Sequence, residues 1–159
     1  MARTIRSTAQ IALLLFSFSV SAASLESFMN NASGLKRFEK KEYTQAYKDF
    51  LKALESDPLN PDLQMNLGMT FEVNEEWDKA EKAYLSAYEL SRGDKRREFF
   101  ALFNLGGEKK KKSDVDGALQ AYKGALDLEP ESLETKTNIK LMWQGQGKGK
   151  GDSKDGKDG

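Results

Sequence analysis

The 159-residue chain contains no cysteine and no histidine, and only three of its residues are proline. These absences remove the side chains most often used as thiol nucleophiles, imidazole general bases and ligands of zinc or haem iron. Without cysteine no disulfide can form, so packing alone must stabilise the fold. The sequence therefore predicts a protein that is not an enzyme and that uses no metal and no cofactor.

Charge of either sign is not in excess, because 25 basic residues balance 25 acidic ones. A balanced chain lacks the positive surface that binds phosphate backbones, so we expect no nucleic-acid partner. Hydrophobic residues make up 38% of the chain and charged residues 31%, a composition typical of a well-solvated helical protein. The length fits about one domain.

The first 23 residues are typical of an export signal. A basic start precedes an apolar core at 11–20, and small residues then offer cleavage after Ala22 or after Ala23. The alternative is an uncleaved membrane anchor, but the apolar segment at 11–23 is shorter than the ~20 residues that cross a bilayer. We predict a signal peptide at residues 1–23 and an exported protein, periplasmic in a Gram-negative bacterium.

A set of small and aromatic residues recurs along the rest of the chain. The first copy holds Ala46, Phe50 and Ala53; the second, 34 residues on, holds Ala80, Tyr84 and Ala87; the third, a further 38 residues on, holds Ala118, Tyr122 and Ala125. A glycine lies twelve residues before the first alanine of each copy, at Gly34, Gly68 and Gly106. Three matches with the same internal spacing indicate a structural repeat.

This pattern resembles the tetratricopeptide repeat (TPR), whose units are pairs of antiparallel helices. The resemblance implies an all-α solenoid in which glycine and alanine lie where two helices cross and the aromatic residues fill the gap between repeats. The implied TPR domain covers 24–144, with repeats at about 27–60, 61–94 and 99–132 and a capping helix at 133–143. A Gly/Lys/Asp-rich segment at 145–159 is predicted to be a disordered tail.

Two departures from the pattern lead to further expectations. Four extra residues separate the second and third units, and they predict a longer, more exposed loop at 92–97. The capping helix has no partner helix, and we expect its apolar residues to cover the last repeat. These residues are Leu133, Ile139, Leu141 and Met142.

In the TPR family the first helix of each repeat lines a concave groove that binds partners. The resemblance places in this groove Phe28, Leu35, Phe38, Met65, Met69, Val73, Phe100 and Phe103. A secondary basic patch follows at Lys109, Lys110, Lys111 and Lys112, which a solvated helix end also explains. The apolar side chains are equally consistent with ordinary core packing, or with a groove covered by the chain's own N-terminal segment.

The chaperone-binding branch of the family grips a C-terminal carboxylate with Lys, Asn and Arg at matched groove positions. In this chain only Asn66 matches, and the other places hold Asn31, Leu35, Phe100 and Asn104. The carboxylate clamp is therefore absent. An apolar groove instead predicts an extended apolar peptide or an amphipathic helix as the ligand.

A narrower resemblance extends over 33–159. The segments Gly-Leu-x2-Phe-Glu-Lys from Gly34, Phe-Phe-Ala-Leu-Phe-Asn-Leu-Gly from Phe99 and Glu-Thr-Lys-Thr-Asn-Ile-Lys-Leu from Glu134 are similar to the exported TPR proteins of bacterial Bat (aerotolerance) operons. This resemblance implies a von Willebrand A domain partner, associated with the membrane, and a role in envelope or stress physiology. The sequence thus predicts a TPR adaptor that does not itself span the membrane; the alternative is a periplasmic chaperone or assembly factor with many clients.

Overall fold

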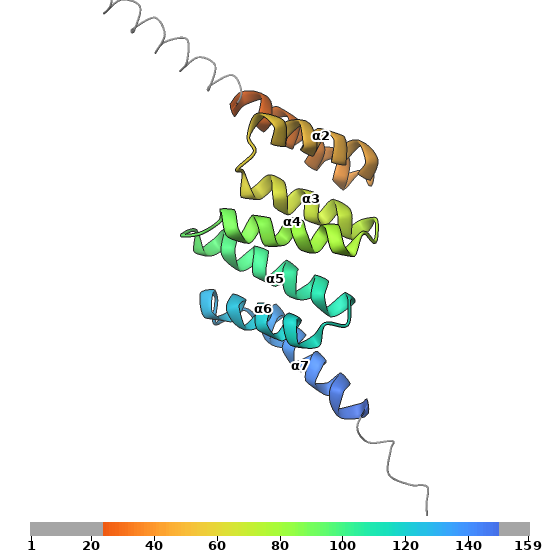
Figure 1. The fold of residues 1–159 in the computed structure, drawn as a ribbon, viewed down its shortest axis with the longest axis vertical. Coiled ribbons are helices and arrows are strands. Elements are labelled where there is room, and N and C mark those ends of the chain that lie inside the picture. The colour runs from red at the N-terminus through yellow and green to blue at the C-terminus, as the bar shows by residue number, and fades with distance from the viewer. Residues whose placement is uncertain (1–23, 150–159) are drawn as a thin grey trace, which may run out of the picture.

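The computed structural model describes residues 24–149, with side chains described to residue 145. The predicted signal peptide and residues 150–159 lie outside this range. Within it every regular element is a helix, and the helices follow one another in chain order along the long axis (Figure 1). After an N-terminal helix at 24–39 come α2 (Tyr43–Ser56), α3 (Pro61–Val73), α4 (Trp77–Leu90), α5 (Lys95–Lys111), α6 (Val115–Leu128) and α7 (Leu133–Gly149).

The helices form three pairs, each closed by the same tight turn. The turns lie at 40–42, 74–76 and 112–114, and their middle residues Lys41, Glu75 and Ser113 all have a positive φ, between 59° and 63°. The amide of the next residue then donates a 2.9 Å hydrogen bond to a carbonyl five residues back, in all three turns. This left-handed residue and back-bond are the usual way to end one helix and reverse the chain.

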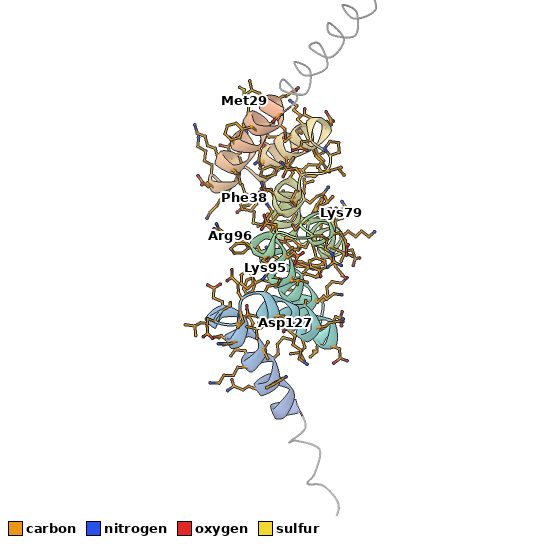
Figure 2. All side chains as sticks on the ribbon, turned by 90° about the vertical axis from the view of Figure 1, so that its left-hand side faces the viewer. Met29, Phe38, Lys79, Lys95, Arg96 and Asp127 are labelled. Carbon is orange, nitrogen blue, oxygen red and sulfur yellow. The ribbon has the colours of Figure 1, made fainter. Side chains whose placement is uncertain are left out.

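The four extra residues of the third unit lengthen a helix and not a loop. The predicted long loop at 92–97 is wrong, because the chain between α4 and α5 covers only 91–94, matching 57–60 and 129–132. Instead α5 has 17 residues where α3 has 13. Four residues make about one helical turn, so the longer helix keeps its faces in register. Lys95 and Arg96 belong to this extra turn (Figure 2).

Within each pair an aromatic ring lies directly on a glycine. A Cβ atom added to Gly68 would lie 2.5 Å from the ring of Tyr84. The other two pairs repeat this contact, with Gly34 at 2.5 Å from Phe50 and Gly106 at 2.8 Å from Tyr122. These distances are too short for any side chain at the glycine. The crossing point of each helix pair is therefore fixed by a ring on one helix and a missing side chain on the other.

The same rings also join successive repeats, as the sequence predicts. Phe50 packs with Leu67 and Ala83 of the second pair, and Tyr84 packs in the same way with Leu105 and Ala121 of the third. The third ring, Tyr122, packs against Ile139 and Met142 of α7. The interior thus consists of three similar clusters along the solenoid, and α7 completes the last one.

The capping helix differs from the prediction in two respects. Ile139 and Met142 are buried as expected, but Leu133 and Leu141 are exposed. The reason is that α7 packs one face on α6 and no further described helix follows to cover the other. The helix also continues to Gly149, into the segment predicted to be a disordered tail, where the sequence has no proline to stop it.

Adjacent glycines give a matched test of the crossing point. Gly68→Ala and Gly106→Ala should each lower the free energy of unfolding by ~1–3 kcal/mol, because the added methyl group overlaps a ring. Gly107→Ala should raise it by ~0.5–1 kcal/mol, because its Cβ meets only the Tyr122 hydroxyl at 3.7 Å and alanine favours the helix. Chemical denaturation followed by circular dichroism measures all three. Equal effects at positions 106 and 107 would contradict the ring contact.

Candidate functional site

The N-terminal helix, α3, α5 and α7 are the first helices of successive units, and together they form one surface, here called the first-helix face. Polar side chains connect neighbouring helices across it. Their hydrogen bonds run from Asn66 Nδ2 to Asn31 Oδ1 at 2.7 Å, from Asn104 Nδ2 to Met65 Sδ at 3.1 Å and from Lys110 Nζ to Asn138 Oδ1 at 3.3 Å. An amide from each helix therefore lies on this face.

The eight apolar residues predicted to line the groove divide into two groups. Phe28, Leu35, Val73 and Phe100 are exposed, between 39% and 70%. Phe38, Met65, Met69 and Phe103 are partly buried and pack against the three core clusters. The Phe103 ring, for example, lies 5.9 Å from the Tyr122 ring, centroid to centroid. The first group therefore offers the most apolar surface to a partner.

Phe100 is an exposed aromatic residue near the start of α5. Its ring packs edge-on against Phe99, with centroids 5.3 Å apart, and the guanidinium of Arg96 lies 5.9 Å from its centroid. These contacts restrict the ring while leaving part of it open to solvent. A ring held in this way loses little conformational entropy when it contacts a ligand.

Three of the four lysines in the predicted basic patch are engaged in ion pairs with the preceding repeat. Lys109 lies 2.8 Å from Glu81, Lys112 lies 2.6 Å from Glu81 and 2.7 Å from Asp78, and Lys111 pairs with Glu72. Hydrogen bonds from Lys109 and Lys112 lower the pKa of Glu81. The bond to Glu81 raises the pKa of Lys109, and the bonds to Asp78 and Glu81 raise the pKa of Lys112. The basic run therefore attaches α5 to α3 and α4.

Lys110 differs from its neighbours in the run. Its only hydrogen bond among the described residues goes to the amide oxygen of Asn138, and no described carboxylate lies within ion-pair distance. Its positive charge is therefore available to a ligand, and it lies on the first-helix face.

Glu108 is buried among the ion pairs, and neither of its carboxylate oxygens has a hydrogen-bond partner among the described residues. Burial is the largest cause that raises its pKa, and the carboxylates of Glu72 and Glu81 act in the same direction. The ammonium groups of Lys111 and Lys112 oppose this shift. A buried carboxyl group without partners favours its neutral form.

Two hollows open on the surface of the third repeat. The first, of about 360 Å³, lies on the first-helix face where α3, α5 and α7 meet. It is lined by Glu72, Phe103, Asn104, Gly107, Lys110, Lys111, Tyr122 and Asn138. It therefore lies at the end of the predicted groove, and it contains two of the predicted lysines and one predicted phenylalanine.

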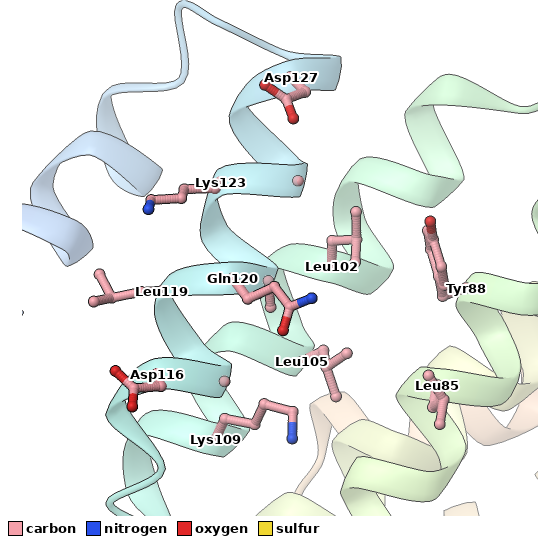
Figure 3. Close-up of a pocket in the computed structure, with 13 residues that line it drawn as sticks. Leu85, Tyr88, Leu102, Leu105, Lys109, Asp116, Leu119, Gln120, Lys123 and Asp127 are labelled. Carbon is pink, nitrogen blue, oxygen red and sulfur yellow. The ribbon is translucent and has the colours of Figure 1, made fainter.

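The second hollow is larger, about 690 Å³, and lies between α4 and α6 (Figure 3). Leu102 and Leu105 of α5 contribute to its apolar lining, with Leu85 of α4 on one side and Leu119 of α6 on the other. Asp116, Asp127, Lys109 and Lys123 also line it. Apolar contacts with a helix or a chain segment are the chemistry that this hollow can offer.

Sequence reasoning did not identify either hollow. The signal for the first is the second glycine of the pair at 106–107, since Gly107 replaces a larger side chain of the other first helices. The second hollow is lined by Gly117 and Gly124 of α6, but a Cβ atom there would meet Asp114 or Leu102, so neither glycine by itself signals the hollow. Within residues 24–149 there is no group of acidic or metal-binding side chains that could hold a metal ion, and no helix is long and apolar enough to span a membrane.

Solved TPR domains have the same arrangement of helices. The TPR domain of Sgt2 from Aspergillus fumigatus matches with a TM-score of 0.72 at 21% identity, over 84% of this chain and 87% of that one. The first TPR of Spaghetti (RPAP3), bound to the HSP90 peptide SRMEEVD, matches with a TM-score of 0.71 at 22% identity. The match covers 78% of this chain and 95% of that one. The N-terminal domain of stress-induced protein-1 from C. elegans matches with a TM-score of 0.69 at 19% identity, over 77% of this chain and 98% of that one.

These similarities establish the fold. The described part of the chain is an all-α TPR solenoid of three helix pairs and a final single helix, as the sequence predicts. No model of a protein family matches the chain, and no curated protein matches it in sequence.

Replacing the buried carboxyl group should change how stability depends on pH. Because the pKa of Glu108 is raised in the folded state, its stabilising contribution is complete below the unfolded value of about 4.3 and is lost as pH rises through the folded value. Glu108→Gln should therefore match the wild type near pH 4 and be more stable at neutral pH. Urea denaturation across this range tests it, with the exposed Glu89→Gln as control. A difference independent of pH would exclude this explanation.

The ion pair between Lys109 and Glu81 should contribute to stability, whereas Lys110 should not. A double-mutant cycle with Lys109→Ala and Glu81→Ala should give a coupling energy of about 1 kcal/mol, because both side chains are about three-quarters buried. Lys110→Ala should change the free energy of unfolding by less than about 0.5 kcal/mol. Denaturation at low and high salt measures both effects. A coupling energy of zero at low salt would show that the ion pair does not contribute to stability.

Proposed function

We propose that this protein is a non-enzymatic adaptor whose first-helix face binds an apolar peptide or an amphipathic helix of a partner protein. The observation that carries this proposal is the group of apolar side chains left exposed there, Leu35, Val73 and Phe100 above all. Binding of a partner on these side chains would bury exposed apolar area, which favours association.

A clamp for a C-terminal carboxylate is not part of this proposal. The chaperone-binding TPR domains grip the carboxylate with polar side chains. At two of the matching positions this chain exposes apolar Leu35 and Phe100. Asn66, the one matching residue, is buried and donates its amide hydrogen to Asn31. The ligand of this face therefore has to be recognised mainly through apolar contacts.

We further propose export and an envelope role for the protein. The support is the signal-like segment at 1–23 and the similarity of 33–159 to the exported TPR proteins of Bat operons. On this proposal the partner is a von Willebrand A domain protein associated with the membrane. The second candidate function is a periplasmic chaperone or assembly factor, favoured by the adaptable side chains Met65 and Met69 beside the exposed group.

Capture from an envelope fraction, followed by mass spectrometry, tests the proposal and separates the two functions. An adaptor should retain one partner at fixed stoichiometry, and a chaperone should retain many unrelated proteins. Phe100→Glu should weaken binding of the captured partner by ~2 kcal/mol or more, because it replaces an exposed apolar ring of the proposed contact with a charge. Isothermal titration calorimetry measures this loss.

The matched control is Leu85→Glu, because Leu85 is about equally exposed but lies in the hollow between α4 and α6. Both variants should keep the wild-type circular dichroism spectrum and melting temperature. Full binding by Phe100→Glu together with lost binding by Leu85→Glu would place the interface between the second helices and overturn the proposal.

A further inference from the structure

The hollow on the first-helix face is lined at one point by a residue without a side chain, Gly107. Corresponding positions of the other first helices hold Leu35, Met69 and Leu141, spaced by the same intervals as the repeats themselves. In α5 this position is Gly107. A Cβ atom there would meet only the Tyr122 hydroxyl within 4 Å, at 3.7 Å. The absence of a side chain at Gly107 therefore leaves part of this hollow, about 360 Å³ in all, unfilled within the predicted groove.

The groups around this space are mainly hydrogen-bond donors. They are the ammonium groups of Lys110 and Lys111, the amides of Asn104 and Asn138 and the hydroxyl of Tyr122. The Tyr122 hydroxyl carries its proton at neutral pH, as tyrosines ordinarily do, and burial raises its pKa further, to about 12. Each of these groups can donate to an oxygen atom placed between them.

The one carboxylate in the lining is already engaged. Glu72 accepts a 2.6 Å hydrogen bond from the Tyr84 hydroxyl and pairs with Lys111. Lys110 has only the Asn138 amide oxygen at 3.3 Å. Two ammonium groups therefore face a single carboxylate, and the surplus positive charge lies at Lys110.

The hollow lies at a defined distance from the exposed Phe100. Seven residues of α5 separate Phe100 from Gly107, which is about two helical turns, so both lie on the same side of the helix about 10 Å apart. An extended peptide covers that distance in about three residues. A peptide that places an apolar side chain on Phe100 can therefore place a second side chain in the hollow.

We propose that the hollow at Gly107 binds the carboxylate side chain of a glutamate or aspartate, about three residues from the apolar side chain that contacts Phe100. This inference rests on the proposed function, because it assumes that the first-helix face binds a peptide. It defines the partner as a segment that combines apolar anchors with one acidic residue. Lys110 supplies the charge, and the missing side chain of Gly107 supplies the room.

Selection from a random dodecapeptide phage library on the mature wild-type protein tests the inference. The peptides are displayed as fusions without a free C-terminus, so any acidic preference comes from side chains. We expect apolar sequences with one Asp or Glu at a fixed spacing. Selected apolar peptides without an acidic preference would overturn the inference and leave the proposed function standing. Failure to select any binding peptide would overturn both.

Fluorescence anisotropy with the best selected peptide and its Glu→Gln or Asp→Asn counterpart then locates the contact. Wild-type protein should bind the acidic peptide about tenfold more tightly, as expected for a charge-assisted hydrogen bond. This ratio should fall below about twofold in Lys110→Gln, which removes the charge, and in Gly107→Met, which restores the side chain found at Met69 and fills the hollow. Lys123→Gln, an exposed lysine of α6, should keep the full ratio. An unchanged ratio in both hollow variants would overturn the inference.

Gly107→Met also excludes unfolding as the cause of a lost preference for the acidic peptide. Its Cβ has no close neighbour, and methionine favours a helix more than glycine does, so the variant should melt at or above the wild-type temperature. It should still bind the neutral peptide with the affinity of the wild type. A folded Gly107→Met variant that retains the preference for the acidic peptide would show that the carboxylate binds elsewhere.

Discussion

The contact between a glycine and an aromatic ring inside each helix pair is the constraint on which the rest of this solenoid depends. It fixes how closely the two helices cross, since the ring lies where any side chain would overlap. The far side of the same ring packs against the next repeat, so one residue determines both the geometry within a pair and the distance between pairs. Stability then accumulates from neighbour to neighbour along the chain, as in other repeat proteins.

The core is regular, whereas the surface differs from repeat to repeat, and the third repeat differs most from the others. It contains the extra turn of α5, the row of lysines paired with the second repeat, the buried Glu108 and the glycine that opens the hollow. A buried carboxyl group without a partner is costly, and it occupies the place taken by Thr70 in α3 and by Met142 in α7. The region between the second and third repeats is therefore the least uniform part of the solenoid.

The four lysines at the end of α5 make different contacts. Lys109, Lys111 and Lys112 turn toward acidic residues of α3 and α4, whereas Lys110 turns toward α7. Adjacent residues of a helix point in different directions, so three lysines of the run reach carboxylates and the fourth reaches an amide oxygen. Composition alone does not reveal this division.

The sequence by itself determined the helix pairs, their order and their crossing points, because the glycine, alanine and aromatic positions repeat at fixed intervals and each pair folds from nearby residues. Only the tertiary structure decided where the extra residues of the third unit go, which predicted groove residues are core and which lysine stays free. These outcomes involve contacts between residues 28 to 39 positions apart on different helices, among them the bond from Arg97 of the extra turn to Asp62. Such contacts are set by how the repeats stack, which no local pattern specifies.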